Sequence, residues 1–155
     1  MFQGQLIGIF IAEKPRGDPR PVDQVEAVPG KGLAGDRYFM GEGTFSTKPG
    51  PDREVTLIEV EALEALLQEA KIELKPNQAR RNLVTRGVPL NHLVGQEFAV
   101  GDVVLRGLRL CEPCNHLEKL TSEGVNKGLV HRGGLRAQVV KGGNLKKDDV
   151  IRPRP

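Results

Sequence analysis

The hydrophobic positions along the chain mark a series of short strands, interrupted once by a longer amphipathic segment. Apolar and β-branched residues predict a first strand over 6–11 and a second over 22–28. Residues 54–58 predict a strand that runs directly into a helix. Beyond Pro76 the strand pattern returns and predicts strands over 82–85, 97–100 and 103–110, and two or three more between 135 and 151, with 142–144 as a turn.

Residues 60–70 carry the clearest helical spacing. The apolar positions expected on one face are Val60, Leu63, Leu66, Leu67 and Ala70, with Glu61, Glu64 and Gln68 opposite. Thr56 followed by Glu59 matches a capping box, which predicts the start of this helix. A second short helix is predicted after Cys114. Many short strands with two helices indicate a mainly β (α+β) fold, a distorted closed barrel with a few peripheral helices.

Composition agrees with short strands and tight turns in one domain spanning residues 1–155. The chain has 19 Gly and 11 Pro but no Trp and one Tyr. A net charge of +3 is too small to indicate a nucleic-acid partner. The first apolar run, 6–12, is too short for a signal sequence or a membrane span, so we expect a cytoplasmic protein without a membrane partner.

The two cysteines, Cys111 and Cys114, are the first candidate chemical centre. Asn115 and Glu118 form a second capping-box pattern, which places Cys114 just before a predicted helix, where the helix dipole favours a thiolate. Four interpretations stay open for this segment. The cysteines are small buried hydrophobic residues, or a redox dithiol, or zinc ligands together with His116 and His131, or one is a thiolate ligand to molybdenum or a similar metal.

Three further segments carry anion-binding chemistry. In the segment 79–87, Arg80 and Arg81 stand close to Asn82 and Thr85 in the sequence. One guanidinium group can bind two oxygens of a phosphate at once. The alternative is a solvated edge strand. The glycine-rich stretch 30–43, with Asp36 and Arg37, and the segment 129–136, with Arg132, can also approach an anion closely; the alternative for both is an ordinary turn.

Together these segments resemble the MOSC family, named after the C-terminal domain of molybdenum cofactor sulfurase. The motifs that carry the resemblance span about residues 4 to 152 and are specific as a set: GLAGDR at 32–37, VTLIE at 55–59, RRNLV at 80–84, LVGQEF at 93–98 with GD at 101–102, CEPC at 111–114 and HRGGLR at 131–136. The resemblance implies a closed β-barrel of the MOSC or pyruvate kinase barrel-domain type and a site for the molybdenum cofactor, Mo-molybdopterin.

The resemblance also implies roles for individual residues. Cys114 matches the family cysteine that ligates molybdenum in the amidoxime-reducing members, which makes it both metal ligand and catalytic residue. Arg80 and Asn82 match an Arg-x-Asn element near the pterin. We expect the cofactor-binding residues to line one concave pocket with Cys114; they are Arg80, Asn82, Asp36, Arg37, Arg132 and Thr85.

The departures from larger members leave three expected functions. The chain lacks the pyridoxal-phosphate domain of the sulfurases, so no pyridoxal phosphate is expected, and it lacks a cysteine-rich segment for an iron–sulfur centre. The first function is a molybdenum oxidoreductase that reduces small N-oxygenated compounds with an external electron-transfer partner. The second is a non-catalytic cofactor or sulfur carrier that uses a Cys114 persulfide and a delivering partner. The third is a structural barrel with an inert thiol.

Overall fold

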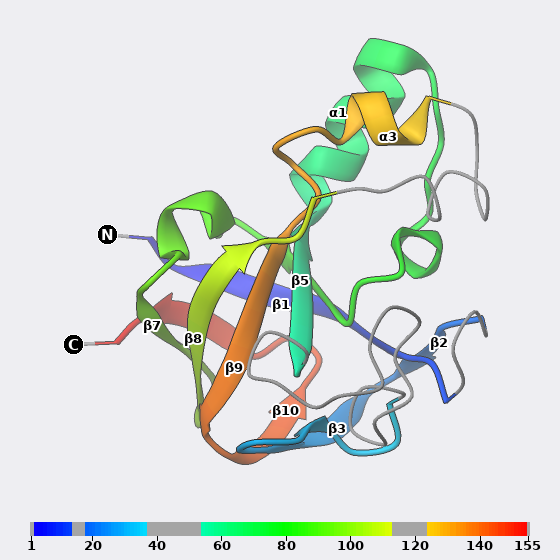
Figure 1. Ribbon diagram of the computed structural model, residues 1–155. Helices are drawn as coiled ribbons and strands as arrows, with labels where there is room; N and C mark the ends of the chain where they lie inside the picture. Colours follow the sequence, from blue (N-terminus) through cyan, green and yellow to red (C-terminus); the bar gives the residue numbers. More distant parts are fainter. Residues whose placement is uncertain (1, 14–17, 37–53, 113–123, 155) are drawn as a thin grey trace.

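Seven strands close into a ring in the computed structural model, which describes residues 2–13, 18–36, 54–112 and 124–154. The ring runs β11-β7-β8-β9-β5-β6-β1, and β1 pairs back onto β11, so the ends of the chain meet on one side of the barrel (Figure 1). The ring strands are β1 (Gly4–Ile11), β5 (Val55–Glu59), β6 (Leu83–Arg86), β7 (Glu97–Val100), β8 (Val103–Leu110), β9 (Leu135–Lys141) and β11 (Val150–Pro153). The predicted closed barrel is confirmed.

The barrel interior is filled by the inward positions of these strands. Side chains alternate between buried and less buried along β9 and β7, as expected when one face of each strand points at a core. Phe98, Leu6, Leu57, Leu105 and Ile151 belong to this single apolar cluster. The strands are therefore held by burial of alternating residues, which is the pattern that the sequence shows.

A small second sheet lies beside one end of the barrel. Its order is β10 (Gly143–Lys146), β3 (Gln24–Val28) and β4 (Gly32–Leu33), while β2 (Arg20–Val22) extends from the edge of β1. The predicted strand over 22–28 is thus two strands on different sheets. The predicted turn over 142–144 is wrong in part, because Gly143 and Asn144 pair with Ala27 and Glu26 within β10.

Helix α1 (Val60–Ala70) connects β5 to β6. Among the named strands, β5 and β6 form the parallel pair. A parallel pair needs such a crossover connection, and the helix covers the outside of the two strands. A second apolar cluster forms there, with Ile58 and Val84 from the strands and Leu66 from α1. Helix α3 (Val125–Gly128) lies beside α1 at the same end of the barrel (Figure 1), and Gly128 leaves room for the side chain of Leu66.

Two details of the predicted helix are wrong. Thr56 is not an N-cap, because it lies within β5 and pairs with Asn82; the helix begins after Glu59, which makes no side-chain cap. The buried face consists of Ala62, Leu63 and Leu66, whereas Leu67 is 47% exposed. The helix is rotated relative to the expected face because it packs against both the strands and α3.

Candidate functional site

A cavity of about 260 Å³ lies where β5 runs into α1. Three segments that are distant in sequence supply its walls: the β5–α1 junction, η3 (Leu90–Leu93) and the segment between α3 and β9. The lining residues are Glu59, Glu61, Ala62, Asn91, His131, Arg132 and Gly134. Gly134 has φ +115°, and a Cβ there would collide with the carbonyl oxygen of Leu57, so glycine is required for this wall to lie against β5.

Two carboxylates come from the β5–α1 junction. Oε2 of Glu59 accepts the backbone N–H of Leu90 at 3.1 Å, and Oε2 of Glu61 accepts that of Gly87 at 2.8 Å. Oε1 of Glu61 is inaccessible to solvent and has no hydrogen-bond donor among the described residues. Burial raises the pKa of Glu59 above its ordinary value, and the nearby charge of Glu61 raises it further.

The opposite wall is fixed by Glu112, which stands two positions before Cys114 in the sequence. Oε1 of Glu112 accepts the backbone N–H of His131 at 2.8 Å, and its Oε2 lies 2.9 Å from Nδ1 of the same residue. Asn91 donates from Nδ2 to the carbonyl of His131 at 2.8 Å, and Cys111 donates its N–H to the carbonyl of Gly134 at 2.8 Å. His131 adopts φ 63°, so these contacts hold a left-handed turn in place.

Arg81 also connects the end of β8 to the segment between α3 and β9. Its Nε donates to the carbonyl of Gly133 at 2.8 Å, and its Nη2 donates to the carbonyls of Cys111 at 3.2 Å and Glu112 at 3.5 Å. A guanidinium group carries five N–H donors in one plane, which lets one side chain bind several carbonyls. Arg81 and Glu112 therefore tie the end of β8 to the cavity wall.

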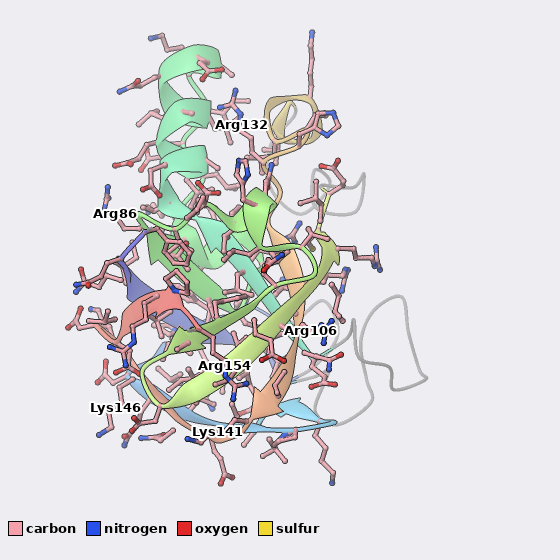
Figure 2. The ribbon with its side chains drawn as sticks, turned by 90° about the vertical axis from the view of Figure 1, so that its left-hand side faces the viewer. Arg86, Arg106, Arg132, Lys141, Lys146 and Arg154 are labelled. Carbon is pink, nitrogen blue, oxygen red and sulfur yellow. The ribbon has the colours of Figure 1, made fainter. Side chains whose placement is uncertain are left out.

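Arg132 stands at the edge of the cavity, at the helical end of the molecule (Figure 2). Its guanidinium group binds Glu69 on α1 through two contacts of 3.1 and 2.9 Å. This pairing lowers the pKa of Glu69 and raises that of Arg132. The Arg132 side chain is 39% exposed, so part of the group still faces solvent.

The polar residues predicted near the pterin on β6 lie inside the fold. Asn82 is 2% exposed; its Oδ1 accepts the N–H and hydroxyl of Thr56 at 3.0 and 3.2 Å, and its Nδ2 donates to the carbonyl of Phe10 at 3.2 Å. Thr85 is also buried, and its hydroxyl lies 3.5 Å from the carbonyl of Ile58. Both side chains connect neighbouring strands in this structure, and their predicted contact with a cofactor stays a prediction.

The remaining predicted site residues come from segments other than β6. Asp36 is buried, and its Oδ1 accepts the N–H of Ala12 at 3.0 Å. Arg80 is half-buried at the end of η2 (Pro76–Ala79) with φ 60°, and not on a strand edge. Cys114 and Arg37 lie outside the described residues. Of the predicted residues that the structure describes, only Arg132 lines the cavity.

Sequence reasoning missed the roles of Glu59, Glu61 and Glu112, and it assigned Arg81 to anion binding, whereas the structure places its guanidinium group on backbone carbonyls. Glu59 was assigned to a helix cap, and Glu61 to a solvated helix face. The available signal was position: Glu112 stands between the two cysteines, and Arg81 lies between Arg80 and Asn82 in the arginine-rich motif. Arg81 and Glu112 hold the wall of the cavity in this structure, whereas the residues beside them in the motifs were expected to bind the cofactor.

The described part of the chain contains neither a membrane-spanning helix nor a cluster of metal-ligand side chains. No helix within 2–13, 18–36, 54–112 and 124–154 is long and apolar enough to cross a membrane. The same residues contain no group of three or more His, Cys, Asp or Glu side chains arranged to hold a metal ion. The zinc hypothesis therefore gains no support from the described residues.

Comparisons with known proteins identify the family. Solved structures with the same fold include the YuaD protein from Bacillus subtilis (TM-score 0.82, 15% identity, 97% of both chains) and YiiM from Geobacillus stearothermophilus (TM-score 0.73, 14% identity, 98% of this chain and 75% of that one). YiiM from Escherichia coli matches with a TM-score of 0.66 and 20% identity, over 97% of this chain and 70% of that one. No curated protein matches in sequence. The model of the MOSC domain matches residues 35–152, and the chain therefore belongs to the MOSC domain family, which is associated with binding of the molybdenum cofactor.

Proposed function

We propose that this protein binds the molybdenum cofactor with Cys114 as the thiolate ligand to molybdenum. The observation that carries the proposal is the network around Glu112. Through Glu112, His131 and Arg81, the chain two residues before Cys114 is fixed to the wall of the cavity that bears Arg132. A soft thiolate suits molybdenum, and a metal ligand needs rigid support from the residues that precede it.

The residues present fit parts of the cofactor. The cavity, at about 260 Å³, is smaller than a typical site for a whole ligand of this size, so it receives one end of the molecule. Arg132 uses two contacts on Glu69 and keeps further N–H donors for a phosphate. The two glutamates repel a phosphate, so in this proposal the phosphate lies with the arginines Arg80, Arg37 and Arg132 and away from Glu59 and Glu61.

Buried polar residues support this site from behind. Asn82 and Thr85 hold the strand that follows Arg80, and Asp36, the residue immediately before Arg37, accepts the N–H of Ala12 directly after β1. In the proposal they hold in place the backbone beside Arg80 and the residue that precedes Arg37 in the sequence. Long cationic side chains bind an anion more tightly when their backbone is already ordered, because less conformational entropy is lost on binding.

The bound molybdenum cofactor would supply two-electron redox chemistry for the reduction of a small N-oxygenated compound. The chain itself would bind and orient the cofactor and the substrate. Electrons would come from a separate electron-transfer protein in the cytoplasm. An alternative proposal is a carrier that holds the cofactor, or sulfur as a Cys114 persulfide, and passes it to another protein.

Metal and pterin analysis of protein produced in a cofactor-competent host tests the proposal. Molybdenum and pterin should each approach one per chain in the wild type and in Cys111→Ser, and fall strongly in Cys114→Ser. Sulfane sulfur that depends on Cys114, without molybdenum, would replace the proposal by the carrier. Equal molybdenum in both serine variants would remove Cys114 as the ligand.

A further inference from the structure

We propose that the outer surface of β7, β8, β9 and β11 is a docking face for a partner protein that presents acidic side chains. These four strands are consecutive neighbours in the barrel. We call this surface the basic face, and its basic residues are Arg106, Arg109, Arg136, Lys141, Arg152 and Arg154. The inference goes beyond the binding of the cofactor, and the role of the partner rests on the proposed function.

The register of the strands brings these charges to one side of the sheet. Arg106 on β8 stands opposite Glu97 on β7, so both side chains leave the same face. Arg152 on β11 pairs with Ala99, two residues after Glu97, and therefore lies on that face too. Lys141 on β9 pairs with the residue of β8 that is two positions before Arg106. Neighbouring strands lie about 4.8 Å apart, so the face is about 15 Å wide from β11 to β9. Figure 2 shows Arg106 and Lys141 on this side of the molecule.

The basic face carries an excess of positive charge. Glu97 is the acidic residue within these four strands, and Arg154 already binds its carboxylate at 2.6 Å. A second carboxylate, Asp102, stands in the turn between β7 and β8. Three basic side chains of the face are exposed and pair with no carboxylate of the described residues; they are Arg106, Lys141 and Arg152. A surface with this imbalance attracts acidic side chains and accelerates association with an acidic partner.

Exposed apolar side chains beside the charges favour a protein as the partner. Val150 is 42% exposed and lies on β11, two residues before Arg152. Val94 is 41% exposed, and it forms a bridge with Gly107, the residue after Arg106. Protein interfaces combine apolar side chains with arginine, whereas surfaces for single-stranded nucleic acid add aromatic side chains that stack on bases. The chain has no Trp and one Tyr, and its net charge is only +3.

The basic face also leads to the candidate site. Arg109 on β8 pairs in register with Arg136 on β9. The next residue but one on β8's side is Cys111, which donates its N–H to the carbonyl of Gly134 in the cavity wall at 2.8 Å. A partner on this face therefore lies along the strand that continues toward Cys114. In the proposed function this partner is the electron-transfer protein, and complexes of that kind are small and steered by charge.

Binding of a dye-labelled glutamate oligomer to the chain, produced as for the metal analysis, is the direct test. The oligomer should bind at low salt and dissociate as salt is added. The double variant Arg106→Gln/Arg152→Gln should weaken binding about fivefold or more, because two exposed charge pairs are lost. Lys75→Gln/Lys127→Gln removes the same charge from exposed positions beside η2 and on α3, and this control should bind like the wild type.

Single-stranded DNA of equal charge, and vesicles of phosphatidylserine and phosphatidylcholine, are the competing probes. Thermal unfolding of each variant shows whether a loss of binding comes from a folded protein. Absence of oligomer binding, or equal weakening by both double variants, would overturn the inference. Tighter binding of DNA or vesicles through Arg106 and Arg152 would overturn it as well, because the face would then serve a nucleic acid or a membrane. Each of these results leaves the molybdenum proposal standing, since the metal and pterin assay on Cys114→Ser decides that separately.

Discussion

Replacing Asn82 by alanine tests whether this residue holds the fold together or contacts the cofactor directly. The resemblance to the family implies a place near the pterin. The Asn82 amide joins three strands: its oxygen accepts from Thr56 on β5, and its nitrogen donates to the carbonyl of Phe10 on β1. Alanine removes the amide while the backbone of β6 stays in place. The N–H of Thr56 and the carbonyl of Phe10 are then left without this partner.

The expected loss follows from these two groups. A buried polar group left unsatisfied costs about 1–3 kcal/mol. The Thr56 contact is buried and should cost near the middle of that range, whereas the Phe10 contact is part-buried, so water recovers some of its loss. Together they predict a decrease of about 2–4 kcal/mol in the free energy of unfolding, or roughly 4–16 °C in Tm for a chain of this length.

Urea denaturation followed by circular dichroism measures this decrease. Asn144→Ala is the matched control, because the Asn144 amide contacts Gln24 in an exposed position on β10, and it should lower the free energy of unfolding by about 0.5 kcal/mol or less. If Asn82→Ala unfolds like the wild type, the buried network does not hold these strands together. Loss of cofactor with unchanged stability would make Asn82 a direct contact.

Three further predictions follow from other contacts. Burial raises the pKa of Glu54 above its ordinary value of 4.5. The protonated Glu54 carboxyl therefore favours the folded state below pH 4.5, and this contribution to stability is lost as pH rises through the raised pKa. Glu54→Gln should flatten this part of the curve of unfolding free energy against pH, and an unchanged curve would contradict the prediction. Arg81→Met should lower the free energy of unfolding by about 1.5–3 kcal/mol in urea denaturation, whereas Arg106→Met, on an exposed position of β8 (Figure 2), should not. Cys111 is 3% exposed, so alkylation of native single-cysteine variants should be slow at Cys111 and faster at Cys114 at every pH, and equal rates would refute the asymmetry.

The barrel could be predicted from the sequence because its signal is local. Alternating apolar residues marked the strand at 103–110, which is the observed β8, and helical spacing marked 60–70, which is the observed α1. The buried face and the cap of α1 could not be predicted in the same way. Both depend on partners that are distant in sequence. Leu66 packs against α3, and the hydroxyl of Thr56 donates a hydrogen bond to Asn82, 26 residues later.

The candidate site was less predictable for the same physical reason. Asn, Thr and Asp residues in a motif can bind a ligand or can satisfy a neighbouring strand, and only the pairing of strands decides between the two. The pairing of β1, β5 and β6 brings Asn82 beside Phe10 and Thr56, and no local pattern contains that information. Glu59 and Glu61 resembled a cap and a solvated helix face because the cavity exists only when the β5–α1 junction meets residues 131–134.

The direct ligand environment of molybdenum tests the central claim, that Cys114 binds the metal. X-ray absorption at the molybdenum edge counts the sulfur neighbours of the metal in wild-type protein and in Cys114→Ser loaded with cofactor in the same host. The account predicts one sulfur neighbour fewer in Cys114→Ser and no change in Cys111→Ser. An unchanged number of sulfur neighbours around the molybdenum that Cys114→Ser retains would contradict it.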